Sequence, residues 1–125
     1  MPLHWLIDSK ARLLVITAEG DVTYADAQEC LASVVGARAM PYRKLFDGTH
    51  GTLAIASDEV LSLGVAFRGF HSSPLGALAL VLAHDQREQI SRLLGVLAAA
   101  ERPIRLFESG LPAKRWLDAF LTNTP

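Results

Sequence analysis

Gly76-Ala-Leu-Ala-Leu-Val-Leu-Ala83 is the stretch of sequence that decides the fold. It is almost continuously apolar, Pro74 precedes it, and His84 and Asp85 follow it. A strand that is apolar on both faces is typical of a parallel sheet that is covered on both sides. A helical pattern follows this run, then the short apolar run Ile104–Phe107, then a second helical pattern. This order predicts an α/β fold.

Size, composition and charge exclude several classes of protein. The chain has 125 residues, which fits a single domain spanning 1–125, and half of the residues are apolar, which excludes a disordered chain. The 12 basic and 13 acidic residues leave a net charge of -1 without a basic stripe, so we expect no nucleic-acid partner. The single cysteine, Cys30, excludes an internal disulfide framework.

The sequence also shows no pattern typical of a signal peptide or of a membrane-spanning helix. The first residues show neither the cationic start nor the long apolar stretch of a signal peptide. No uninterrupted apolar run approaches the roughly 18 residues of a membrane-spanning helix. We therefore expect a cytoplasmic protein with no membrane span.

The first part of the chain predicts a hairpin and a helix. Leu3–Asp8 and residues 12–18 are expected to pair as antiparallel strands, closed by Gly20 and Asp21. A helix is expected over residues 23–38, with Thr23 and Asp26 spaced as a capping box. Its buried stripe is predicted to consist of Tyr24, Ala27, Leu31, Val34 and Val35.

The middle of the chain predicts a third strand, a loop and a second helix. Residues 42–46 form the expected strand, and residues 47–52 the loop, whose two glycines are expected to adopt positive φ angles. Ser57 opens a helix over residues 57–70, with Asp58 and Glu59 in its first turn. This helix is apolar almost all the way round, so it is either deeply buried or presents its outer face to a partner.

Two more helices and one strand complete the prediction. A helix is expected from Asp85, which is spaced with Glu88 as a capping box, to Glu101, where Pro103 follows. After the strand Ile104–Phe107, the last helix presents an apolar face made of Ala113, Trp116, Leu117, Phe120 and Leu121. The predicted order of elements is ββαβαβαβα.

This order and length resemble the STAS-like, or SpoIIAA-like, superfamily, which includes anti-sigma-factor antagonists and cytoplasmic domains of sulphate transporters. The small stand-alone bacterial members, loosely described as STAS- or SEC14-like, show a strand followed by Glu-Gly-Asp-Val-Thr, here Glu19 to Thr23. A strand ending in Asp follows, here Asp47, and then Ser57-Asp-Glu-Val60. The resemblance implies a mostly parallel five-stranded sheet with an antiparallel N-terminal strand.

The resemblance does not carry over one feature of the antagonists. These proteins have Asp-Ser-Ser/Thr-Gly at the start of the second helix, where a serine is phosphorylated. The corresponding residues here are Ile55-Ala-Ser-Asp58, without the preceding Asp and the following Gly. We expect Ser57 to serve as a helix cap, and the sequence leaves open whether it is ever phosphorylated.

A candidate ligand or regulatory site lies where the parallel strands end, because ligands of such sheets bind at the carboxyl ends of the strands. Asp47, Thr49, His50 and Ser57 are the candidate residues of a regulatory or ligand loop. Catalytic, cofactor and metal sites are not expected, because caps and solvated loops explain these residue types and no histidine pair has ligand spacing. We call the whole set the carboxyl-end rim: Asp47, Thr49, His50, Ser57, His84, Asp85, Glu108 and Ser109.

The second helix is the candidate interface. Phe67 and Phe70, with Arg68 and His71 at the edge, would form an apolar patch for a partner if they are exposed. In the antagonists this helix and the preceding loop face the partner kinase, which the resemblance carries over as an expectation.

The pattern as a whole favours a non-enzymatic regulatory or protein-interaction module of STAS-like type, expected as a homodimer with a further protein partner. The alternative is a carrier of a small apolar or lipid-like ligand, because SEC14-like proteins bind lipids and this chain is rich in Leu, Ala and Val. An enzyme is the third hypothesis. Native mass spectrometry separates the first two, since it reports oligomeric state and retained ligand together.

Overall fold

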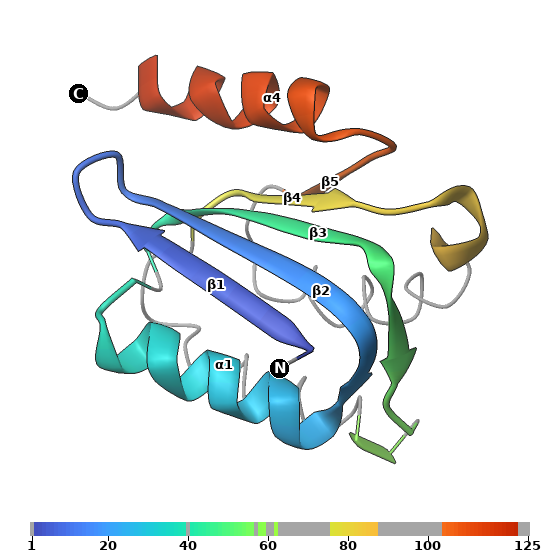
Figure 1. The fold of residues 1–125 in the computed structure, drawn as a ribbon. Helices are drawn as coiled ribbons and strands as arrows, with labels where there is room; N and C mark the ends of the chain where they lie inside the picture. The colour runs from blue at the N-terminus through green and yellow to red at the C-terminus, as the bar shows by residue number, and fades with distance from the viewer. Residues whose placement is uncertain are drawn as a thin grey trace.

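The computed structural model describes residues 2–39, 41–56, 58–59, 62, 76–87 and 104–122. Within them, a five-stranded sheet with strand order β1-β2-β3-β4-β5 forms the centre of the fold (Figure 1). β1 runs antiparallel to β2, and every other neighbouring pair is parallel. The predicted α/β class and sheet are therefore confirmed. The strands are β1 (Leu3–Asp8), β2 (Leu13–Thr23), β3 (Arg43–Ala54), β4 (Leu78–Val81) and β5 (Ile104–Phe107).

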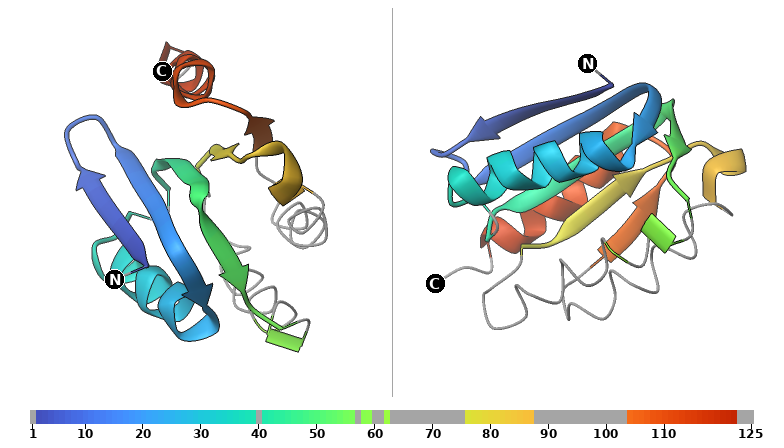
Figure 2. Two further views of the ribbon diagram at one scale, coloured as in Figure 1. Left: turned by 45° about the vertical axis from the view of Figure 1, so that its right-hand side comes forward. Right: turned by 90° about the horizontal axis from the view of Figure 1, so that it is seen from below.

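Helices lie on both faces of this sheet. α1 (Tyr24–Gly36) contacts β1 and β2, and α4 (Gly110–Thr122) contacts β3, β4 and β5 on the opposite face (Figures 1 and 2). All four residues of β4 are buried, as its uninterrupted apolar sequence predicts for a strand between two others. Most of the two other predicted helices, at residues 57–70 and 85–101, lies outside the described part of the chain, so those helices remain predictions.

α1 begins at the predicted cap. The Thr23 N–H donates to Asp26 Oδ2 at 2.9 Å, and the Asp26 N–H donates to Thr23 Oγ1 at 3.3 Å. These two bonds form a capping box, which satisfies N–H groups that have no partner inside the helix. Hydrogen bonds from the Thr23 backbone and side chain also lower the pKa of the Asp26 carboxyl.

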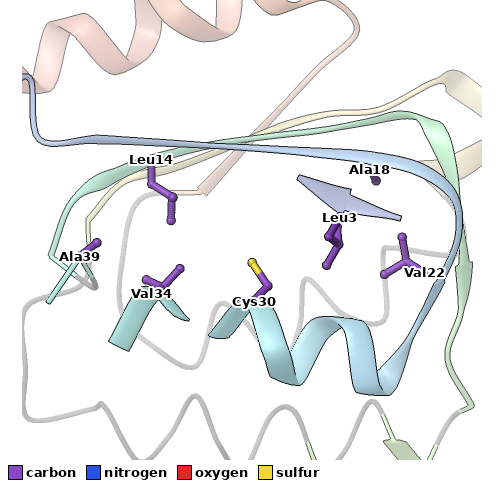
Figure 3. Close-up of a cluster of buried hydrophobic side chains, with 7 residues drawn as sticks. All are labelled: Leu3, Leu14, Ala18, Val22, Cys30, Val34 and Ala39. Atoms are coloured by element: carbon purple, nitrogen blue, oxygen red, sulfur yellow. The ribbon is translucent and has the colours of Figure 1, made fainter. Parts of the chain in front are cut away.

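The buried face of α1 differs by one position from the prediction. Val34 is buried as expected, but Val35 is 40% exposed, and Cys30 is buried instead. Cys30 and Val34 are four residues apart and share one face of the helix, whereas Val35 is turned about 100° away from Val34. Figure 3 shows both side chains pointing towards the sheet, in a cluster formed by Leu3, Leu14, Ala18, Val22, Cys30, Val34 and Ala39.

The apolar face of α4 packs on the other side of the sheet. Ala113 and Leu117 are buried, as predicted, together with Ala79 and Val81 of β4. Trp116 is half-buried and its ring lies 5.8 Å from that of Phe107, measured between centroids. The side chains of Phe120 and Leu121 lie outside the described part.

β2 and β3 are longer than predicted, and the predicted loop at residues 47–52 is wrong. These residues belong to β3 and stay paired with β2, which itself continues past Gly20 to Thr23. Among the described glycines, Gly20 alone has a positive φ angle, of 75°. Gly48 and Gly51 instead permit close packing: a Cβ on Gly51 would lie 2.6 Å from the Cβ of Ala18. The glycines mark tight contact between strands rather than a turn.

Candidate functional site

A bulge in β3 is the main feature at the carboxyl ends of the parallel strands. Thr17 of β2 pairs with Asp47, but Glu19 pairs with His50, so β3 has one more residue than β2 over this interval. We call Asp47–Gly48–Thr49–His50 the β3 bulge. Beyond it, β2 and β3 curve together towards the start of α1 (Figure 1). A bulge bends its strand and re-aims the side chains near it, which is why bulges often lie beside binding sites.

Asp47 fixes the shape of this bulge. Its Oδ1 accepts hydrogen bonds from the Thr49 N–H at 3.1 Å and from Thr49 Oγ1 at 2.7 Å. A side-chain oxygen that binds a backbone N–H two residues later is the usual stabilisation of a local turn. Gly48 between them is buried, and a Cβ there would lie 3.0 Å from side-chain atoms of both Leu82 and Phe46. The geometry of the bulge therefore explains why Asp, Gly and Thr occupy positions 47, 48 and 49.

Gln86 joins the bulge to the next strand end. It belongs to the short helix η1 (His84–Gln86), which follows β4. Its Nε2 donates to the carbonyl oxygens of Gly48 at 2.5 Å and Gly51 at 2.7 Å, and its Oε1 accepts from the Ala83 N–H at 2.7 Å. The side-chain nitrogen and oxygen of Gln86 are thus both hydrogen-bonded to backbone atoms, in β3 and at Ala83.

Sequence reasoning missed Gln86. It placed a capping box at Asp85 and Glu88, but the described contact is between Gln86 and the Ala83 N–H, two residues earlier than predicted; Glu88 itself lies outside the described residues. The spacing from Ala83 to Gln86, three residues, is the one local signal that could have indicated this residue, because a glutamine at the third helical position often reaches back to the cap.

Arg87 and Glu108 form a further polar contact at this edge. Arg87 Nη2 lies 3.4 Å from Glu108 Oε1, and the two side chains are 37% and 70% exposed. Arg87 is half-exposed, and its Nε is buried without a hydrogen-bond partner among the described residues. Glu108 follows β5, so this ion pair links the ends of β4 and β5.

Histidine and glutamate side chains lie in a row across the first three strands. His4 Nε2 of β1 is 3.8 Å from Glu19 Oε2 of β2, and Glu19 is the register partner of His50 on β3. Residues that pair across a sheet point to the same face. All three side chains are exposed. The row extends the polar surface from the β3 bulge to the edge of the sheet.

The structure places part of the predicted carboxyl-end rim. Asp47 and Thr49 are half-buried and bonded to each other, and His50 is exposed beside them. His84, Asp85 and Ser109 are exposed, and no hydrogen bond in the described region joins them to the bulge. The predicted site residue Ser57 and the predicted interface residues Phe67, Arg68, Phe70 and His71 lie outside the described part.

The chemistry of this edge is that of a polar surface. The side chains of Asp47 and Gln86 form hydrogen bonds to backbone atoms, and Thr49 bonds to Asp47. The exposed side chains beside them are imidazoles and carboxylates, such as those of His50 and Glu19. In the described ranges no group of three or more His, Cys, Asp or Glu side chains could hold a metal ion. Cys30 lies in the α1 core, where burial and, to a smaller degree, the neighbouring Glu29 raise the pKa of its thiol to about 11. A thiol of this kind is a poor nucleophile at neutral pH.

Comparison with solved structures assigns the architecture. The chain is similar to an uncharacterised protein of the DUF3478 family with a SpoIIAA-like fold from Shewanella loihica PV-4, with a TM-score of 0.62. The similarity covers 92% of this chain and 91% of the other, at 18% sequence identity. The fold is SpoIIAA-like. At this identity the likeness concerns the fold, so the resemblance proposed from the sequence is confirmed at that level.

Two further comparisons gave no relatives, since neither a protein-family model nor a curated protein matches the chain. In the described part of the structure, no helix is both long and apolar enough to cross a membrane.

Proposed function

We propose that this SpoIIAA-like protein is a non-enzymatic regulatory or protein-interaction module. Its partner would contact the surface around the β3 bulge, at the carboxyl ends of the parallel strands. The interface predicted on residues 67–71 remains a second, untested part of the same proposal.

The bonding of Gln86 is the observation that carries this proposal. One amide holds two carbonyl oxygens of β3 and one N–H after β4, so the surface has a fixed shape before any partner arrives. A preorganised surface loses less conformational entropy on binding than a mobile one. The exposed groups beside it, such as His50 and Glu19, can donate and accept hydrogen bonds at the rim of an interface.

Site-directed photo-crosslinking in the host cell tests the proposal. A photoreactive phenylalanine analogue in place of His50 should capture a discrete protein, which is then purified and titrated against the unmodified chain. Lys114 is the matched control, because it is exposed on α4 and belongs neither to the β3 bulge nor to β1. Equal capture at both positions, or no binding by the purified partner, would contradict the proposal.

Native mass spectrometry of the purified protein supplies the complementary readout. An interaction module should appear as bare chains, alone or associated. A retained small apolar molecule, combined with no specific adduct at His50, would replace the proposed function by the carrier alternative.

A further inference from the structure

β1 is an edge strand whose outer side has no partner in the described structure. Among the described strands it is the first of the sheet and pairs with β2 alone. In the right-hand view of Figure 2, β1 forms the outer border of the described structure. Natural edge strands are usually blocked by a lysine, a proline or a bulge. Leu3–Asp8 contains none of these, and Leu6 near its centre is 71% exposed.

The alternation of hydrogen-bonded and non-bonded pairs between β1 and β2 shows which backbone groups of β1 face outward. The Glu19 N–H donates to the Pro2 carbonyl oxygen at 2.8 Å, so Pro2 and Glu19 are a hydrogen-bonded pair. Hydrogen-bonded pairs alternate with non-bonded pairs along an antiparallel ladder. His4, Leu6 and Asp8 therefore direct their backbone groups to β2, while those of Leu3, Trp5 and Ile7 face the open edge.

We propose that a second copy of this chain pairs with this edge, β1 against β1 in antiparallel orientation, about a twofold axis at Leu6. The sheet would then be continuous across two copies. This inference deepens the proposed interaction function by assigning the surface through which the module associates with itself, and it leaves the β3 bulge free for another partner.

The side chains of β1 select this register. With Leu6 opposite its own copy, Trp5 and Ile7 become a hydrogen-bonded pair, so the outward backbone groups meet each other. Leu6 and its copy then form a non-bonded pair, in which side chains approach most closely. His4 comes to lie opposite Asp8 of the second copy, twice by symmetry, which places an imidazole beside a carboxylate.

The neighbouring registers lose this complementarity. A shift that sets Trp5 opposite itself places His4 against Leu6 and leaves Asp8 without an imidazole. The opposite shift sets Ile7 opposite itself and places the Asp8 carboxylate against Leu6. A carboxylate opposite a leucine loses part of its water and gains no partner, so this register is less favourable.

Existing contacts of the two polar residues are compatible with the pairing. Asp8 Oδ1 accepts from the N–H groups of Lys10 and Ala11 at 3.1 and 3.0 Å, which leaves Oδ2 for the imidazole of the second copy. His4 lies at 3.8 Å from Glu19, outside hydrogen-bond distance, and its side chain is 55% exposed. Both groups can thus bind across the new interface without breaking a bond in their own chain.

Sedimentation equilibrium of the full chain tests the association. The wild-type protein should show twice the 13.5 kDa of one chain, and Leu6→Glu should raise the dimer dissociation constant about tenfold or more, because two carboxylates would meet at the axis. Leu111→Glu is the matched control on α4, where Leu111 is 64% exposed, and should leave the constant unchanged. A monomeric wild type, or a dimer sensitive to Leu111→Glu and not to Leu6→Glu, overturns the proposal.

Charge and cysteine variants test the register. His4→Lys should keep the dimer, and His4→Asp should weaken it, since only the second places like charges opposite each other. Leu6→Cys should form a disulfide-linked dimer on mild oxidation, whereas His4→Cys should not, because residue 4 lies far from its own copy in this register. Equal crosslinking of the two cysteine variants would overturn the assigned pairing.

These outcomes are separable from those of the proposed function. Photo-crosslinking at position 50 can be repeated in the Leu6→Glu variant. Capture by the Leu6→Glu monomer is the result that both proposals expect. Capture by a wild-type protein that is itself monomeric rejects the β1 interface alone, and a Leu6-dependent dimer that captures nothing at position 50 rejects the partner site alone.

Discussion

Gly76 is a residue whose identity is dictated by a neighbouring backbone. A Cβ at this position would lie 1.9 Å from the carbonyl oxygen of Tyr42, and backbone cannot move aside cheaply. Gly76→Ala should therefore destabilise the fold by about 3 kcal/mol or more, at or beyond the upper end for overpacked sites. Gly36→Ala is the control, because nothing lies within 4 Å of the added atom, and it should be neutral or stabilising by up to about 1 kcal/mol. Urea unfolding measures both, and equal effects would contradict the close-approach explanation.

Cys30 gives a residue-level prediction of pH dependence. The pKa of its thiol is about 11 in the folded protein, above its ordinary value of 9.0. Between these values the folded chain keeps a proton that the unfolded chain has lost, so stability should fall as pH rises through this range. Cys30→Ala removes the titrating group, and its unfolding free energy should decline less between pH 8.5 and 10.5. Parallel declines for both proteins would show that other groups carry the effect.

Single residues of the candidate site were predictable only in part. Asp47, Thr49 and His50 could be located from the sequence, because polar residues follow Leu45 and Phe46, although the strand itself continues to Ala54. The bonds of Gln86 to Gly48 and Gly51 could not be predicted, since they span 38 and 35 residues of sequence, and only its local contact with Ala83 has a sequence signal. Val35 was assigned to the core because helical spacing identifies an apolar stripe on the helix but not the middle of its buried face. The contact of α1 with β1 and β2 determines which residues of the stripe are buried.

Among elements, the β3 bulge depends on an amide supplied by η1. Gln86→Ala would leave the carbonyl oxygens of Gly48 and Gly51 without their donor, in a half-buried environment. We expect a loss of about 1–3 kcal/mol in the free energy of unfolding, the usual cost of unsatisfied buried groups. Gln28→Ala on the exposed face of α1 is the matched control and should change stability by less than about 0.5 kcal/mol.

Hydrogen exchange separates this explanation from general destabilisation. In Gln86→Ala the amides of residues 47–52 should exchange faster than those of residues 13–17, which pair before the bulge. Uniformly faster exchange over both ranges would mean that Gln86 supports the whole sheet and not the bulge.

Local and non-local elements differed in how well the sequence indicated them. The start of α1 was predicted correctly because Thr23 and Asp26 lie three residues apart and determine the cap by themselves. The second halves of β2 and β3 were missed because their extended form comes from pairing with each other, Gly20 with Gly51 and Val22 with Leu53. A glycine in such a pair has the same local signature as a glycine in a turn.

Over the whole molecule, Arg43 ties three segments together. It lies at the start of β3, its side chain is 11% exposed, and its Nη1 donates to the Leu117 carbonyl oxygen of α4 at 3.0 Å. Its Nη2 donates to the Ala11 carbonyl oxygen, in the turn between β1 and β2, at 2.8 Å. Leu117 is 74 residues away in sequence, so no local pattern predicts this contact.

Arg43→Met should separate the docking of α4 from the stability of the sheet. Methionine keeps an apolar stem but removes both donors, so two carbonyl oxygens lose a charged partner, and we expect a loss of about 1.5–3 kcal/mol. Asp118→Ala removes only the more exposed ion pair, in which Asp118 Oδ1 lies 3.5 Å from Arg43 Nη1, and should cost at most about 1 kcal/mol. Chemical denaturation gives both values.

The place of the loss is as informative as its size. Because α4 covers β3, β4 and β5 while α1 covers β1 and β2, weakening the Arg43 bridge should open one face of the sheet first. Hydrogen exchange in Arg43→Met should rise over residues 110–122 of α4 and stay near the wild-type rate over residues 24–36 of α1. Equal acceleration in both helices would mean that the two faces unfold together and that Arg43 stabilises the sheet as a whole. Equal losses of unfolding free energy in Arg43→Met and Asp118→Ala would mean that the ion pair with Asp118, and not the two bonds to carbonyl oxygens, provides the stabilisation.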